Sequence, residues 1–282
     1  PGFFDSVSKT GAYNQTGTTA TSSYPDAYIA ELNSSNEVIW ATYFGGNGPD
    51  NFSSVAIGED NSVLVSGSTL SINAASLDMG STPCNVPDSP IYFPDCNPGG
   101  GAYHSTYNGT GADEDAIIVQ FDQNSALEWS TYFGGEGNET AYSGISVLKN
   151  AVAVNPNDPS IVYLVGGTGD LEGFPTMGSD PEYYQTESIL GRRAFIAKFN
   201  EKAQEWTTVF GGGTFTDAFD VAVSSNNCVY MVGHTNASDY ASNTCDVPDS
   251  ETDEFAKCEA ADVYFQPHYG GGARDGYIAA FN

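Results

Sequence analysis

One short phrase occurs three times in this chain and constrains the fold more than any other feature. Each copy is an aromatic-rich stretch that ends on two consecutive glycines, and each contains one of the three tryptophans. The copies are Val38 to Gly46, Glu128 to Gly135 and Trp206 to Gly212. A rare residue that returns at intervals of roughly 80 residues indicates an array of one supersecondary unit. We therefore expect a repeat protein in which Trp40, Trp129 and Trp206 are equivalent.

Between these phrases lie further short segments that are typical of strands, because they are rich in β-branched and aromatic residues and are bounded by Gly, Asn, Asp and Ser. The predicted strands are Ala27 to Leu32, Val38 to Phe44, Phe52 to Ile57, Ser62 to Ser68, Ala116 to Phe121, Leu127 to Phe133, one strand within Ser143 to Val154, Ile161 to Gly166, Ala194 to Phe199, Glu205 to Phe210, Ala218 to Val223, Val229 to Val232 and Gly276 to Phe281. Short strands with short antiparallel connections predict four-stranded meanders.

This pattern predicts an all-β fold in which residues 1–282 form a single, partial β-propeller domain of four-stranded antiparallel blades. The predicted blades are residues 26–69, 115–168 and 194–235, with the start of a fourth at 276–282, and the long inserts are 69–114 and 235–275. Tryptophan then packs between blades, and the glycine pairs make a tight exit from the strand. These pairs are Gly45 and Gly46, Gly134 and Gly135, and Gly211 and Gly212. A stacked solenoid of sheets is the alternative, because the repeat length does not determine closure.

The charge of the chain excludes two classes of partner. Thirty-six acidic residues against eight basic ones give a formal charge of −28, which repels nucleic acids and anionic membrane surfaces. No apolar run approaches the roughly 18 residues of a membrane-spanning helix. We therefore expect no nucleic-acid partner and no membrane insertion. Such acidity favours solubility in a saline medium, and cation binding is the alternative interpretation.

The cysteines indicate an oxidising environment. Cys84 and Cys245 begin nearly identical Cys-x-Val-Pro-Asp-Ser phrases, and each phrase is followed by one more cysteine, Cys96 or Cys258. This repetition predicts two local disulfides, which place the protein outside the reducing cytosol. Zinc is the alternative, but the Cys-x-x-Cys pairs and clustered histidines that it prefers are missing. Cys228 lies in an apolar run and is expected to be a buried thiol.

No catalytic motif is present in the sequence. The glycine-rich turns contain Asp50, Glu139 and Asp217. Three long connections between units, which we call the excursions, run from about Thr69 to Glu114, Thr168 to Arg193 and Thr235 to Asp275. The predicted connectivity places the glycine-rich turns on the same face as these excursions, where function concentrates. These carboxylates are interpreted as turn-capping acceptors or, as a weaker alternative, as ligands of a cation such as Ca²⁺. Surface or packing roles are expected for the three histidines, which are His104, His234 and His268.

The order of motifs resembles a known repeat family. A Thr-Tyr-Phe-Gly-Gly phrase is followed by an apolar strand ending in Gly-x-Thr, then by Phe174-Pro175-Thr176, Tyr184-Gln185-Thr186 and the strand before Asn200. This order resembles the SBBP repeat of bacterial β-propellers, found in large secreted and cell-surface proteins, notably of Bacteroidota. The disulfide inserts, and the loss of Phe-Pro-Thr from the first and third excursions, depart from the family pattern. The resemblance implies a propeller fold and an extracellular location, but no reaction.

Together these patterns predict a non-enzymatic extracellular module for adhesion or for surface or filament assembly, acting through its insert-bearing face. The expected partners are other blades of a longer chain, other protein subunits or surface glycans. A carbohydrate-active enzyme, either a glycoside hydrolase or a lyase with carboxylates on that face, is the alternative. Because Tyr277 to Phe281 opens a fourth blade without its other strands, we also expect further blades in a longer polypeptide or packing against another subunit.

Overall fold

The computed structural model describes residues 7–15, 24–72, 84, 92–96, 113–139, 150–169, 171–178, 191–239, 254–255 and 270–282. Over these residues the regular structure consists of strands, and no helix capable of crossing a membrane is found in them. The strands are β1 (Ala27–Leu32), β2 (Val38–Phe44), β3 (Asp50–Ile57), β4 (Val63–Thr69), β5 (Asp115–Phe121), β6 (Leu127–Phe133), β7 (Ala151–Asn155), β8 (Asp158–Thr168), β9 (Arg193–Asn200), β10 (Ala203–Phe210), β11 (Thr216–Val223), β12 (Val229–Thr235), β13 (Ser238–Asp239), β14 (Glu254–Phe255) and β15 (Asp275–Phe281).

The all-β fold and the positions of the predicted strands are confirmed. β1, β2 and β6 have the predicted bounds, and the other predicted strands differ by a few residues at their ends. A short run of β-branched and aromatic residues between turn residues is a local signal, and it is sufficient to find such strands. The short parallel pair of β13 and β14 is not indicated by the sequence pattern.

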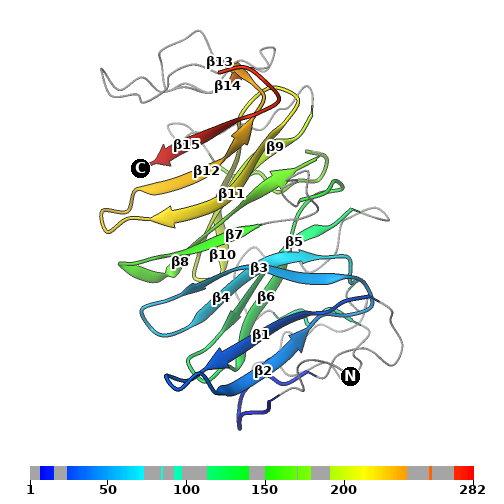
Figure 1. Ribbon diagram of the computed structural model, residues 1–282, viewed down its shortest axis with the longest axis vertical. Helices are drawn as coiled ribbons and strands as arrows, with labels where there is room; N and C mark the ends of the chain where they lie inside the picture. Colours follow the sequence, from blue (N-terminus) through cyan, green and yellow to red (C-terminus); the bar gives the residue numbers. More distant parts are fainter. Residues whose placement is uncertain are drawn as a thin grey trace.

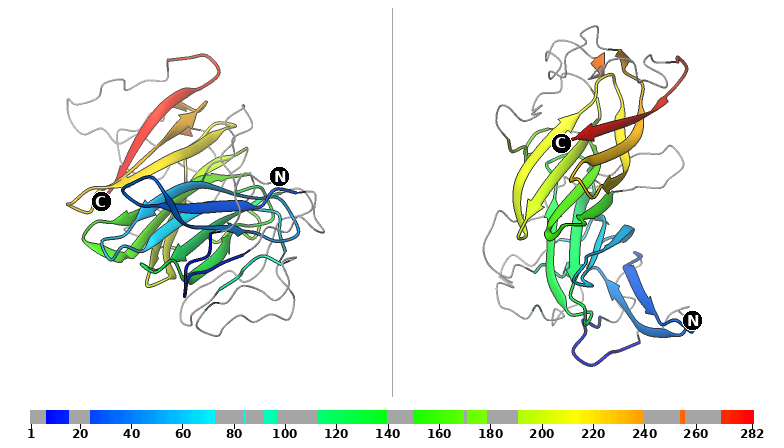
Figure 2. Two further views of the ribbon diagram at one scale, coloured as in Figure 1. Left: turned by 60° about the horizontal axis from the view of Figure 1, so that its bottom comes forward. Right: turned by 90° about the vertical axis from the view of Figure 1, so that its left-hand side faces the viewer.

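The strands form a row of stacked sheets. In chain order these are the pair β1-β2, the four-stranded sheets β3-β4-β5-β6 and β7-β8-β9-β10, and the three-stranded sheet β11-β12-β15, and strand pairing within all of them is antiparallel. Figure 1 shows them stacked along the long axis, from β1-β2 at one end to β15 at the other, and Figure 2 shows the same order from other directions. Neighbouring sheets contact each other mainly through their first strands, β3, β7 and β11.

The sheets do not coincide with the predicted blades 26–69, 115–168 and 194–235. Each predicted blade contains the last two strands of one sheet and the first two strands of the next. The excursion after β4 returns to pair β5 with β4, from Val63↔Phe121 to Thr69↔Asp115, so the inserts 69–114 and 235–275 connect neighbouring strands within one sheet. The short glycine-rich turns cross between sheets instead. Loop length could not distinguish the two arrangements, because the entropic cost of closing a loop grows slowly with its length.

Each tryptophan packs between two sheets. The ring of Trp40 lies 5.3 Å from that of Phe121, Trp129 lies 5.5 Å from Phe199, and Trp206 lies 5.8 Å from Phe281, all in edge-on geometry. In every pair the tryptophan is on the last strand of one sheet and the phenylalanine is on the third strand of the next. Edge-to-face aromatic pairs add stabilisation beyond the area they bury, so these pairs hold the stack together where no strand ladder joins the sheets.

The excursions contribute a second layer of aromatic contacts. Phe174 packs edge-on against Phe133 at 5.6 Å, and Phe93 packs in the same way against Phe44 at 5.4 Å. The first excursion therefore keeps the Phe-Pro motif, as Phe93-Pro94-Asp95, although the sequence pattern indicates its loss there. Aspartate stands here in the place of the threonine of Phe174-Pro175-Thr176, so a search for Phe-Pro-Thr does not find the equivalent segment.

The disulfide between Cys84 and Cys96 is present, with Cα atoms 5.7 Å apart, and Cys228 is a free buried thiol within the described part of the chain. Cys96 also forms an isolated β-bridge with Ser130 of β6. The disulfide therefore lies at the point where the first excursion meets the outer strand of its own sheet. Cys245 and Cys258 lie outside the described residues, so their pairing stays a prediction.

We expect peptide mapping without reduction to find Cys84 linked to Cys96, Cys245 linked to Cys258, and Cys228 unlinked. Replacing Cys84 and Cys96 together with serine should lower the free energy of unfolding by about 2.5–3 kcal/mol, because a loop of this size is no longer closed in the unfolded chain. Urea denaturation of the double variant and of the parent measures this loss. A link between Cys84 and Cys245 would contradict the local pairing.

Candidate functional site

The candidate site is the side of the stack, formed by strand ends, where each glycine pair crosses to the next sheet. One backbone hydrogen bond repeats there: the N–H groups of Asp50, Glu139 and Thr216 donate to the carbonyls of Pro25, Glu114 and Arg192 at 2.9, 2.9 and 3.0 Å. Asp50, Glu139 and Thr216 therefore occupy equivalent positions. Asp217 lies one residue later, in the place of Asn51, which differs from the equivalence that the sequence pattern indicates. We call the three junctions around Asp50, Glu139 and Thr216 the glycine-rich end.

In the first two junctions the second glycine of the pair allows a close approach of two backbone segments. A Cβ on Gly46 would lie 2.6 Å from the Phe93 nitrogen, and one on Gly135 would lie 2.7 Å from the Phe174 nitrogen. Neither distance leaves room for a side chain, so only glycine fits. In the third junction Gly211 has a φ of 109°, which other residues rarely adopt. The glycine pairs thus serve the crossing itself.

In the first junction Asp50 is a buried hydrogen-bond acceptor. The Gly46 N–H donates to its Oδ2 at 2.9 Å, the Ser71 hydroxyl donates to the same oxygen at 2.7 Å, and the Thr69 hydroxyl donates to Oδ1. Burial raises the pKa of Asp50 to about 7, although these three donors lower it and Asp26 raises it further. Asp50 therefore ties the exit from β2 to the end of β4, as a turn-capping acceptor does.

In the second junction two buried carboxyl groups lie together. The Thr168 hydroxyl donates to Glu139 Oε1 at 3.0 Å, while Oε2 has no hydrogen-bond partner among the described residues. Asp115 is also fully buried, and its Oδ1 and Glu139 Oε2 both border Gly134. Burial, followed by the charge of Asp115, raises the pKa of Glu139 to about 9. Glu139 is therefore protonated near neutral pH.

In the third junction a hydroxyl replaces the carboxyl group. Thr216 donates to the Gly212 carbonyl at 2.8 Å and shares a 2.8 Å hydrogen bond with the Thr235 hydroxyl. The neighbouring Asp217 accepts a 2.7 Å hydrogen bond from Arg192 Nε, and Arg192 also donates to the Gly167 carbonyl at 2.9 Å. Because Arg192 precedes β9 and Asp217 lies on β11, this charged pair joins the second four-stranded sheet to the three-stranded sheet.

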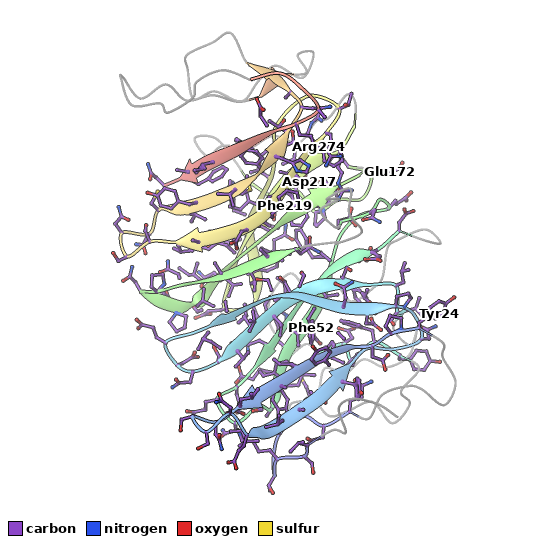
Figure 3. All side chains as sticks on the ribbon, viewed as in Figure 1. Tyr24, Phe52, Glu172, Asp217, Phe219 and Arg274 are labelled. Carbon is purple, nitrogen blue, oxygen red and sulfur yellow. A yellow bond between two sulfur atoms is a disulfide. The ribbon has the colours of Figure 1, made fainter. Side chains whose placement is uncertain are left out.

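His234 completes the third junction as a packing residue. Its ring lies 5.1 Å from Phe215 and 4.6 Å from Phe219, and Arg274 covers Phe215 at 4.1 Å. Burial, then Arg274 and Arg192, lower the pKa of His234 to about 4, so its 3.8 Å contact with Asp217 is no ion pair near neutral pH. Figure 3 shows Asp217, Phe219 and Arg274 close together at this end. His104 and His268 lie outside the described residues.

The described part of the chain contains no group of three or more His, Cys, Asp or Glu side chains that could hold a metal ion. Asp50, Glu139 and Asp217 lie in three separate junctions, and each accepts hydrogen bonds from a hydroxyl group or a guanidinium. The sequence pattern does not indicate Asp115, whose place beside Glu139 depends on a strand pairing across the whole first excursion. Asp115 and Glu139 are completely buried, so a polysaccharide cannot reach them as a catalytic pair.

These observations define the class of protein as an all-β repeat protein built from stacked antiparallel sheets. No known family model matches the chain, and no curated protein aligns with it. The function therefore has to be proposed from the geometry.

Proposed function

We propose that this chain is a non-enzymatic module of the cell exterior, of the SBBP β-propeller type, which serves adhesion or surface assembly through its glycine-rich end. The observation that carries the proposal is where the three excursions begin and end. Each leaves the second strand of a sheet and returns to the third at paired residues: Thr69 and Asp115, Thr168 and Arg193, Thr235 and Asp275. All three excursions are therefore anchored at equivalent strand ends on one side of the stack, where loops on a rigid scaffold can form a binding surface.

Two further observations support an extracellular location and a binding role. The Cys84–Cys96 disulfide is the kind of bond that persists in oxidising compartments. The carboxyl groups at the sheet junctions are buried in structural hydrogen bonds, so we do not propose them as the groups that bind a partner. Surface glycans and other protein subunits are the partners that we propose.

Binding is tested with purified chain and a panel of insoluble polysaccharides in a co-sedimentation assay. We expect one or more of them to retain the protein, and we expect replacement of Tyr103 and Tyr107 in the first excursion with alanine to weaken retention, because aromatic faces stack on sugar rings. The matched control is Tyr28→Ala, an exposed tyrosine on β1. Equal weakening by both variants, or retention by none of the polysaccharides, would count against the adhesion proposal.

The same preparations are used to test for activity by measuring the release of reducing sugars and of unsaturated products. No turnover is expected, because the carboxyl pair of Asp115 and Glu139 is completely buried. Turnover that a single carboxylate substitution abolishes would establish the carbohydrate-active enzyme instead.

A further inference from the structure

The second junction contains two buried carboxyl groups that face the same small space. Asp115 and Glu139 are both 0% exposed. A Cβ on Gly134 would lie 2.2 Å from Glu139 Oε2 and 3.2 Å from Asp115 Oδ1, so both oxygens border the space that the missing side chain leaves. Glu139 Oε2 has no hydrogen-bond partner among the described residues. Because two carboxylates side by side are unfavourable away from water, a proton or a cation has to neutralise part of their charge.

The first junction has less buried charge and more donors. Its Asp50 accepts hydrogen bonds from two hydroxyl groups and one backbone N–H. Asp26, which has the place of Asp115 in its sheet, is only partly buried. Glu139, in contrast, accepts a hydrogen bond from one hydroxyl group of the described residues. The protein groups that stabilise the first junction therefore do not fully account for the second.

In the third junction a cationic side chain stands in the place of the carboxyl pair. Arg193 is the first residue of β9, as Asp115 is the first residue of β5, and both pair with the threonine of a Gly-x-Thr ending. Thr216 takes the place of Glu139 in this junction. Arg193 is 4% exposed, and its Nη1 donates to the Gly213 carbonyl at 2.6 Å. Where both acids are lost, the chain thus places a buried positive charge.

We propose that Asp115 and Glu139 hold a calcium ion in the second junction, in the role that the Arg193 guanidinium has in the third. Calcium fits because it binds carboxylate and carbonyl oxygens at about 2.3–2.6 Å. Magnesium fits a buried site less well since it usually keeps several of its water molecules, and zinc prefers nitrogen and sulfur ligands. Arg192 also acts on Glu139, but its guanidinium pairs with Asp217 at 2.7 Å, so its charge is shared with a third carboxylate.

Backbone carbonyls supply further oxygen ligands. Besides the Gly213 carbonyl, the Arg193 side chain contacts the carbonyl of Arg192, to which its Nη1 donates at 3.2 Å. The carbonyls in the same places of the second junction belong to Glu136, directly after the glycine pair, and to Glu114, directly before β5. A carbonyl oxygen has two lone pairs, so it can bind an ion while it accepts a backbone hydrogen bond. These two carbonyls are therefore the further ligands in the proposed site.

Calcium and a proton compete for the same oxygens. Without calcium, a proton on Glu139 neutralises one of the two charges, so the calcium-free chain can still fold. Binding of calcium requires the carboxylate and releases that proton. The pH dependence of stability that Glu139 is expected to cause is therefore a property of the chain without calcium.

The test measures calcium bound to the purified chain. Because the site is completely buried, calcium chloride is added both to the folded chain and during refolding from urea. Gel filtration in sodium chloride then removes loosely held ions, and mass spectrometry of the metal content counts those that stay. We expect a single calcium ion per parent chain. The melting temperature should be higher in calcium chloride than in EDTA or in magnesium chloride, because an ion bound only to the folded chain stabilises it.

Three variants assign the ion to its ligands. Glu139→Gln is nearly isosteric and should lose the ion. Asp50→Asn is the matched control, since it changes the buried carboxyl group at the equivalent position of the first junction, and it should keep the ion. The double variant with Asp115→Arg and Glu139→Thr copies the third junction, so it should melt at the same temperature in calcium chloride and in EDTA. Circular dichroism in EDTA shows whether each variant is folded.

A parent chain that holds no calcium after either treatment would overturn the proposal. Calcium that stays in folded Glu139→Gln, or that Asp50→Asn loses to the same extent, would also overturn it, because the ion would then bind elsewhere. If the double variant does not fold, the comparison of Glu139→Gln with Asp50→Asn decides the question by itself. None of these outcomes bears on the proposed adhesion, which does not use the buried carboxyl groups.

Discussion

Replacing Trp129 with alanine is expected to lower the free energy of unfolding by about 3–5 kcal/mol. Trp129 is 1% exposed and its ring lies 5.5 Å from Phe199 of the next sheet. The smaller side chain leaves a cavity between two sheets that no strand ladder joins, so the surrounding backbone can close the gap only in part. Because the whole stability of a domain is typically about 5–15 kcal/mol, this one substitution should shift the unfolding transition strongly.

The equivalent tryptophan at the last interface is the matched control. Trp206 has the same place in its repeat and packs on Phe281, but it is only partly buried. Urea denaturation followed by circular dichroism should therefore rank Trp206→Ala well below Trp129→Ala in its effect. Equal losses for the two variants, or a Trp129→Ala variant that melts like the parent, would mean that burial between sheets is not what stabilises the stack.

The strands could be predicted from the sequence, whereas their grouping into sheets could not. The aromatic and β-branched residues within Leu127 to Phe133 are a local signal, and the structure has that strand with the same bounds. The second partner of β4 could not be predicted in this way. Thr69 pairs with β3, which is close in sequence, but it also pairs with Asp115 on the far side of the first excursion. β4 is hydrogen-bonded on both edges only in the folded sheet, and the spacing of residues along the chain does not predict this second pairing.

The candidate site could likewise be predicted only in part. A carboxylate after a glycine pair indicates a turn-capping acceptor, and Asp50 has that role in the structure. The third junction breaks the pattern, since Thr216 takes the equivalent place and Asp217 binds Arg192. The pairing of Glu139 with Asp115 was beyond sequence reasoning, because the charge and burial that perturb Glu139 come from a residue on another strand.

Raising the pH from 5 to 8 is expected to destabilise the folded chain, and Glu139 should account for the largest single part of the effect. The pKa of Glu139 is about 9 in the folded chain, against a usual value of 4.5. Between these two values the folded chain keeps a proton that the unfolded chain has released, so stability decreases as pH rises. One such group contributes about 1.4 kcal/mol per pH unit, or up to about 4 kcal/mol over this range. Asp50 adds a loss of the same sign up to pH 7 or so, because its pKa is also raised, to about 7.

Glu139→Gln isolates this contribution from the general repulsion among the acidic residues, which also grows with pH. Glutamine is nearly isosteric, can still accept the hydrogen bond from Thr168, and carries no titrating proton. The melting temperature of the variant should therefore depend less on pH than that of the parent, with the gain largest at pH 8. Glu136→Gln, an exposed residue in the same turn, should keep the parent's pH dependence. If Glu139→Gln and the parent lose the same stability between pH 5 and 8, Glu139 ionises in the folded chain without cost, and the buried carboxyl pair with Asp115 is not the origin of the effect.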